Sequence, residues 1–246
     1  MNNRREMVMR ELGLTPLWRV RGQALAHVTE PVHSTVAGHV PSVSVSVTDR
    51  RATILKMDWQ ELKLVVAGCT ACELHAARNK TVFGVGDEKA SWLFVGEGPG
   101  ADEDMQGEPF VGQAGKLLDN MLAAIDLKRG SDVYIANIVK CRPPKNRNPE
   151  SGEAASCEPY LTRQIALMQP RLIVALGKVA AQNLLGTDAS IVSLRGRVHR
   201  YQAIPVIITY HPAYLLRNLT DKARAWEDLC FARETMAELK SVTATP

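Results

Sequence analysis

The sequence predicts an α/β protein, a three-layer α/β/α sandwich around a parallel sheet of four strands. Four short segments are almost continuously apolar, which is typical of strands covered by helices on both faces. Segments with apolar residues at helical spacing lie between the first three of them. Strands that alternate with helices along a chain favour a parallel sheet.

The elements follow one another in this order. We expect strands at residues 92–96, 133–139, 172–176 and 206–210. We expect helices around residues 117–125, 161–168, 179–185 and 226–240, the third of which ends at Gly186. In such sheets the chemistry gathers in the loops that follow the carboxyl ends of the strands.

Composition divides the chain once. Residues 31–48 contain no charged side chain and are rich in Ser, Val and Pro, which is typical of a flexible linker. Residues 4–21 form a short amphipathic segment that favours an accessory helix. We therefore expect an N-terminal extension and linker over residues 1–59 and the main domain over residues 60–246.

Charge and hydropathy bound the environment. The net charge is +4, which only weakly indicates a polyanionic partner. No apolar run is long enough for a membrane span, and the first residues carry charges where a signal peptide needs an apolar stretch. An odd number of cysteines, five, argues against a disulfide framework. We expect a cytoplasmic protein, with no membrane partner, that is a monomer.

Four cysteines have the spacing of a metal site. Cys69 and Cys72 form a C-x2-C pair, and Cys141 and Cys157 can complete a four-thiolate set. Thiolates favour zinc or an iron–sulfur cluster, and the spacing leaves both open. Cys230 lies on the apolar side of the last expected helix, so we expect it in the core.

A basic loop follows the second expected strand. It contains no acid and has prolines and no periodicity. Charge runs are usually solvated, but beside a metal-binding cysteine these residues are candidates for phosphate contacts. The four basic residues are Lys140, Arg142, Lys145 and Arg147.

Two other loops carry candidate site residues. Glu97 follows the first strand, where a carboxylate could orient water, and Phe110 lies in a Gly/Pro-rich turn, where it could stack on a flat ligand. The glycines of this loop match neither a dinucleotide nor a P-loop pattern. Asn137 lies near the end of the second strand and His211 follows the fourth. The apolar and basic residues after it suggest a wedge that enters a duplex, namely Leu215, Leu216 and Arg217.

Four motifs in order resemble the iron–sulfur uracil-DNA glycosylases, often called family four. They are GEGPGADED, GEPFVGQAG, ANIVKCRPP and HPAYLLRN, together with the four cysteines, and the resemblance covers about residues 60–240. It implies the α/β/α glycosylase fold, a structural [4Fe–4S] cluster on Cys69, Cys72, Cys141 and Cys157, with zinc as the less favoured occupant, and excision of uracil from DNA.

The resemblance also implies roles for individual residues. Phe110 would stack on the flipped uracil, Asn137 would hydrogen-bond its edge, and His211 would donate toward its O2. Glu97 and Gly98 would line the pocket beside the attacking water. Glu103 would lie near C5 of the base.

The sequence also bears on other functions. A zinc nucleobase deaminase needs an H-x-E motif, which no histidine of this chain begins. Relatives that trap DNA covalently carry a histidine before the fourth cysteine, and residues 138–157 contain none, so ordinary hydrolysis is expected. The alternatives are an iron–sulfur DNA-binding protein without uracil excision and a glycosylase for another deaminated base.

Overall fold

The computed structural model describes residues 47–242. The expected accessory helix at residues 4–21 and almost all of the expected linker at residues 31–48 lie outside the described residues. Within the described part, no helix is both long and apolar enough to cross a membrane.

The described residues form one six-stranded sheet in the order β1-β3-β2-β4-β6-β5. The four central strands are parallel, as predicted, and the two edge strands, β1 and β5, are antiparallel to their neighbours. The fold class is therefore confirmed, and the expected number of strands was too low. The strands are β1 (Val85–Gly86), β2 (Trp92–Gly96), β3 (Val133–Asn137), β4 (Leu172–Leu176), β5 (His199–Tyr201) and β6 (Ile204–Thr209).

The two edge strands give little signal in sequence. β1 has two residues, one of them glycine, and β5 has three residues that are exposed or partly exposed. In contrast, every residue of β2, β3 and β4 is buried, which produces the continuous apolar runs. A continuous run identifies a central strand, whereas a short edge strand needs no such run.

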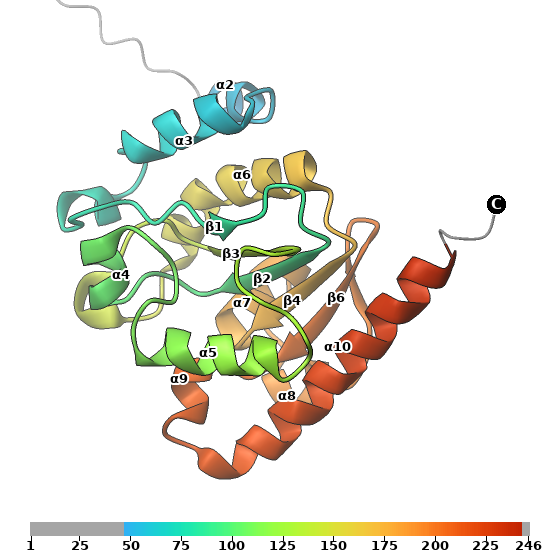
Figure 1. Cartoon of the computed structure of the whole chain (residues 1–246). Coiled ribbons are helices and arrows are strands. Elements are labelled where there is room, and N and C mark those ends of the chain that lie inside the picture. Colours follow the sequence, from blue (N-terminus) through green and yellow to red (C-terminus); the bar gives the residue numbers. More distant parts are fainter. Residues whose placement is uncertain (1–46, 243–246) are drawn as a thin grey trace, which may run out of the picture. The chain divides into compact units, whose positions relative to one another are not determined.

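Helices cover both faces of the sheet (Figure 1). One face packs against α5 and α10, and the other against α3, α6 and α7. These layers supply the two core clusters of the sandwich. The α-helices are α2 (Val47–Ile54), α3 (Trp59–Ala67), α4 (Ala101–Gln106), α5 (Gln113–Ala123), α6 (Ser151–Met168), α7 (Lys178–Leu185), α8 (Ile191–Leu194), α9 (Pro212–Leu215) and α10 (Lys222–Val242). Single 3-10 turns lie at η1 (Glu73–Ala76), η2 (Pro144–Asn146) and η3 (Leu219–Asp221).

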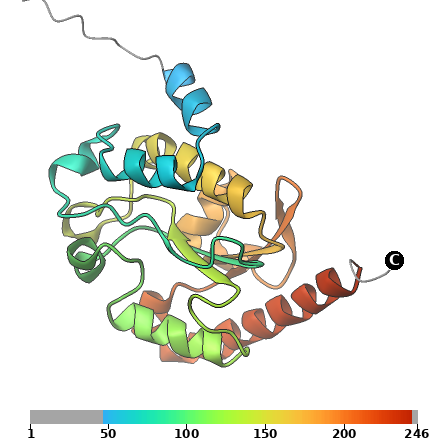
Figure 2. The ribbon, with the colours of Figure 1, turned by 45° about the horizontal axis from the view of Figure 1, so that its top comes forward.

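Residues 47–59 contribute to the core, although the sequence placed them in the extension. Ile54 of α2 is 1% exposed and belongs to the same buried cluster as α3 and α6. Asp58 begins α3 by accepting hydrogen bonds from the backbone N–H groups of Gln60 and Glu61. Figure 2 shows α3 lying beside α6.

The parallel strands bring their carboxyl ends to one edge of the sheet. Gly96 of β2 is paired with Asn137 of β3. Gly177 follows β4, and His211 follows β6 after one intervening residue. The loops that were expected to carry chemistry therefore start next to one another.

Candidate active site and cysteine pocket

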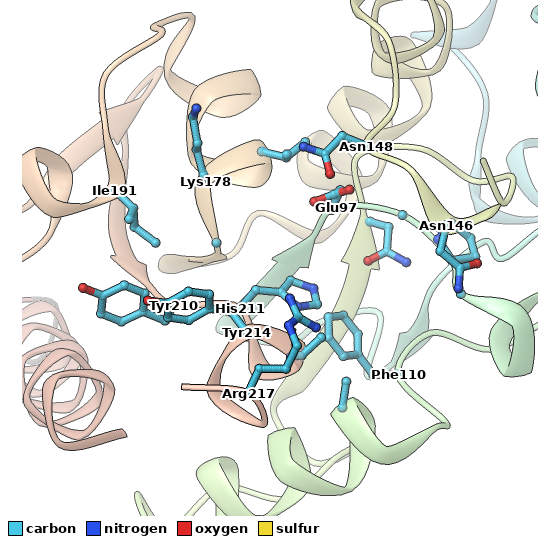
Figure 3. Close-up of a pocket in the computed structure, with 18 of the residues that line it drawn as sticks. Glu97, Phe110, Asn146, Asn148, Lys178, Ile191, Tyr210, His211, Tyr214 and Arg217 are labelled. Atoms are coloured by element: carbon cyan, nitrogen blue, oxygen red, sulfur yellow. The ribbon is translucent and has the colours of Figure 1, made fainter. Parts of the chain in front are cut away.

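A cleft of about 710 Å³ opens at this edge of the sheet. Glu97, Phe110, Asn137 and His211 all line it, so the structure brings together the main residues singled out in the sequence. Figure 3 shows the Phe110 and His211 side chains close together and Glu97 across the cleft from them. The cleft therefore has the Glu97 carboxyl group on one side and the rings of Phe110 and His211 on the other.

Phe110 is held in an unusual backbone conformation. Its φ is +56°, in the left-handed region that costs energy for a bulky residue. Arg129 donates hydrogen bonds to the carbonyl oxygens of Pro109 (2.9 Å) and Phe110 (2.8 Å), and it forms an ion pair with Asp119. The Phe110 ring is 6% exposed. Arg129 therefore secures the turn that places the ring on the cleft wall.

Asn137 lies at the end of β3 with its side chain enclosed. It is 2% exposed, and its Oδ1 is buried without a hydrogen-bond partner within the described residues. A Cβ at Gly96 would lie 2.5 Å from this oxygen and 2.6 Å from the Phe110 ring, so the site requires glycine there. A buried, unsatisfied amide oxygen on a cleft wall is suited to a ligand donor.

His211 is the N-cap of α9. Its Nδ1 accepts a hydrogen bond from the backbone N–H of Ala213 at 3.2 Å, so a neutral ring carries its hydrogen on Nε2. Burial, and then the charge of Arg217, lower the pKa of His211 to about 4. Gly177, at φ +93°, makes room for the histidine, since a Cβ there would lie 2.8 Å from the His211 Cβ. The ring is thus a neutral hydrogen-bond donor.

Two glutamates of the loop after β2 have different surroundings. Burial raises the pKa of Glu97, whose side chain lines the cleft near Gly98. The carboxylate of Glu103 accepts hydrogen bonds from the backbone N–H groups of Gly100 (3.0 Å), Val111 (3.0 Å) and Gly112 (3.2 Å). Glu103 also lines the cleft, but its oxygens are engaged in joining α4 to the Phe110 turn.

The basic loop is only partly available to a polyanion. The expectation that Lys140 contacts phosphate is wrong, because its side chain is 1% exposed and bonded inside the protein. Arg142 donates to Asn146, and Lys145 is exposed. Arg147 lines the cleft and pairs with Glu153 at 2.7 Å.

The loop after β6 also differs from expectation. Leu215 is 1% exposed and packs in the core cluster with α5 and α10, so its assignment to a wedge is wrong. Leu216, at 42%, and Leu219, at 64%, are exposed, and Arg217 is exposed beside them. Leu219 was missed because it lies in a 3-10 turn beyond the motif.

The four expected cysteines line a second, small pocket together with Arg78. Three sulfurs accept hydrogen bonds, Cys69 from the Ala71 N–H (3.5 Å), Cys141 from Arg78 (3.1 Å) and Cys157 from the Lys140 N–H (3.2 Å). Such donors stabilise thiolates. Cys230 does not line the pocket and is partly exposed, not buried in the core.

The thiols of the pocket are not drawn together around one point. Within residues 47–242, no group of three or more histidine, cysteine, aspartate or glutamate side chains is arranged to hold a single metal ion. Burial raises the pKa of Cys157 to about 12, and burial raises the pKa of Cys141 against the opposing effect of Arg78. A bound cationic group would favour the ionised form of these two thiols.

Some cleft residues escaped the sequence analysis. Lys178 follows the carboxyl end of β4 and lines the cleft, so the strand-end rule applied to all four strands would have found it. Arg78, beside the cysteine pocket, and Arg129, behind the Phe110 turn, do not line the cleft, and no local pattern indicates their contacts.

Comparison with known proteins places the chain in a family. Residues 83–230 match the Uracil DNA glycosylase superfamily. A type-4 uracil-DNA glycosylase of Archaeoglobus fulgidus is 48% identical over 159 residues, covering 61% of this chain and 79% of the relative. One of Pyrobaculum aerophilum is 42% identical over 182 residues, covering 70% and 92%. A type-5 enzyme of the same organism is 31% identical over 150 residues, covering 54% and 66%. The chain belongs to the uracil-DNA glycosylase superfamily and, within it, to the type-4 uracil-DNA glycosylases.

Proposed function

We propose that this protein removes uracil from DNA by hydrolysing the bond between the base and the sugar, which leaves an abasic site. The observation that carries the proposal is the cleft itself. An aromatic ring, an unsatisfied buried amide and a neutral imidazole line the same space at the strand ends. These groups are suited to a flat base that has a polar edge and departs with negative charge.

Recognition of the base falls to Phe110 and Asn137. The Phe110 ring offers a stacking surface, and base–aromatic stacking contributes about 1–3 kcal/mol. The Asn137 amide offers an acceptor and a donor, which match the N3–H and O4 of uracil. Flipping the base costs a few kcal/mol, which these contacts and the filling of the gap in the duplex offset.

Bond breaking falls to His211 and Glu97. As the C1′–N1 bond breaks, positive charge develops on the sugar and negative charge on the uracil. The Nε2–H of His211 donates toward O2, where that negative charge is shared. Glu97 holds the water whose oxygen bonds to C1′. The water loses one proton, and the departing uracil ends by gaining one.

Contact with DNA falls to basic and apolar side chains in and near the cleft. The exposed Lys145 and the partly exposed Arg142 and Arg147 contact phosphates in this proposal, and the exposed Arg217 lies beside the wedge. Leu216 takes the role first given to Leu215, because Leu216 is exposed and Leu215 is not.

The cysteine pocket holds a [4Fe–4S] cluster in this proposal, bound by Cys69, Cys72, Cys141 and Cys157. The donor set fits this group, because the four sulfurs line one pocket and three of them accept hydrogen bonds from N–H groups. The bound cluster supplies a cross-link that orders the loops carrying the four cysteines.

Measurement of the free base released from defined oligonucleotides tests the proposal. Matched oligonucleotides would carry one uracil, hypoxanthine, xanthine, thymine or cytosine. Release of uracil, with none of thymine or cytosine, is expected. Release of a purine alone would assign the enzyme to another deaminated base. Tight DNA binding without release of any base would favour a binding protein and contradict the proposal.

A further inference from the structure

Lys140 is buried in an unusual environment, and it has no role in the proposed chemistry. Its side chain is 1% exposed, which is rare for lysine. The Nζ atom donates to the backbone oxygen of Asn137 at 3.0 Å and to Oε1 of Gln164 at 2.7 Å. Burial of an ammonium group costs free energy unless such partners are present, so these two hydrogen bonds offset the cost of burying Lys140.

Gln164 is fixed in turn. It is fully buried on α6, and its amide nitrogen donates to the backbone oxygen of Phe83 at 3.0 Å. This bond orients the amide so that its oxygen faces the ammonium of Lys140. The lysine head is therefore held from α6 as well as from the end of β3.

The same residue touches the cysteine pocket. The backbone N–H of Lys140 donates to the sulfur of Cys157 at 3.2 Å, and Cys141 is the next residue. Lys140 thus donates one hydrogen bond from its main chain to a cysteine sulfur and another from its side chain to the carbonyl oxygen of Asn137.

We propose that Lys140 is a positioning residue for Asn137. Through Lys140, the ordering of the loop that carries the cysteines affects the position of the Asn137 amide, which binds the base. The proposal rests on the role given above to Asn137. That amide has no hydrogen-bond partner for its Oδ1 within the described residues, so its aim depends on the backbone at the end of β3. Lys140 holds that carbonyl.

A double-mutant cycle tests the connection. Lys140→Met keeps the length of the side chain and removes its donors. We expect the single-turnover excision rate to fall about ten- to a hundredfold, with a smaller change in substrate affinity, while the visible absorption of the cluster is retained. In an Asn137→Ala background the same substitution should cost almost nothing, because its effect passes through Asn137. Independent, additive losses would overturn the proposal, and so would an unchanged rate.

A second variant keeps the test open if Lys140→Met loses the cluster or does not fold. Gln164→Met removes only the outer partner of the ammonium, and it should show a smaller loss that again disappears in the Asn137→Ala background. Lys56→Met is the matched control, since Lys56 is exposed and lies outside the cleft. Additive losses for Gln164→Met would overturn the proposal.

Hydrogen exchange separates this proposal from the proposed function. Without DNA, the amides of residues 137–141 should exchange faster in Lys140→Met than in the wild type, and Lys56→Met should leave them unchanged. This result supports the positioning role even if uracil is not the substrate. Unchanged exchange in Lys140→Met would overturn it even if the wild-type protein excises uracil.

Discussion

The Phe110 ring lies 5.4 Å from the His211 ring, between ring centroids, with their planes 31° apart. The two residues come from loops after different strands, β2 and β6, so the fold and not the local sequence creates the pair. A base that stacks on Phe110 lies beside the imidazole. The same base can therefore be held by stacking and stabilised by a donor as it departs.

Replacement of His211 tests the donor role. We expect His211→Asn to reduce the single-turnover rate about 10²–10³-fold, as for loss of one oxyanion-hole donor. Asparagine is a good N-cap, so α9 should remain capped. Equal melting temperatures for the variant and the wild type would show that the loss is chemical. A variant as fast as the wild type would contradict the role.

The loss of activity at low pH should result from protonation of Glu97. Burial raises the pKa of Glu97, so its carboxylate takes up a proton at a higher pH than an ordinary glutamate, and kcat/KM should fall as pH falls through that value. Glu97→Gln should be slow, with a rate that no longer depends on pH in this range. An acid limb that persists in the variant would assign it to another group.

His211 should stay neutral through the same range. Its pKa is about 4, below the ordinary value of about 6.5. The folded protein therefore resists protonation that the unfolded chain accepts, and this group lowers the free energy of unfolding as pH falls from about 6.5 to about 4. NMR titration of the His211 ring measures the midpoint directly. A midpoint near 6.5 would contradict a buried, neutral imidazole.

Arg129 should affect activity through Phe110. Arg129→Met removes the two hydrogen bonds to the carbonyl oxygens of Pro109 and Phe110 and so frees a backbone held at positive φ, and we expect kcat/KM to fall about ten- to a hundredfold through misplacement of the ring. Arg233→Met is the control, because Arg233 is half-exposed and its ion pair with Asp126 is long, at 3.9 Å. If Arg129→Met and Arg233→Met were equally active, Arg129 would have no role in positioning Phe110.

Adjacent leucines should separate stability from duplex binding. Leu215→Ala opens a space in the core and should lower the free energy of unfolding by about 2–5 kcal/mol. Leu216→Ala should change it by less than about 0.5 kcal/mol and should slow excision from duplex more than from single-stranded DNA. Denaturant unfolding and the two substrates measure both effects. If Leu215→Ala impaired excision from duplex DNA and Leu216→Ala lowered the stability instead, Leu215 would be the wedge residue.

The sequence predicted the parts of the fold that depend on local pattern. Continuous apolar runs identified the four central strands, and the strand-end rule placed Glu97, Asn137 and His211 at one edge. The short edge strand β1 has no such run. Its pairing with β3 depends on tertiary packing that no local pattern carries.

The errors in the site have the same origin. Lys140 resembles its basic neighbours in sequence, but its burial depends on Gln164, which lies on another element 24 residues away. Leu215 and Leu216 are alike in sequence, and only the packing of α9 against α5 distinguishes them. Side chains within one motif can therefore have opposite environments that only the folded chain reveals.

The most direct test of uracil excision uses a labelled oligonucleotide with a single uracil and protein purified without oxygen. We expect strand cleavage at the uracil only after treatment with alkali, which breaks abasic sites, and no cleavage of an otherwise identical thymine oligonucleotide. An intact strand after alkali, with the cluster present, would show that the protein does not excise uracil.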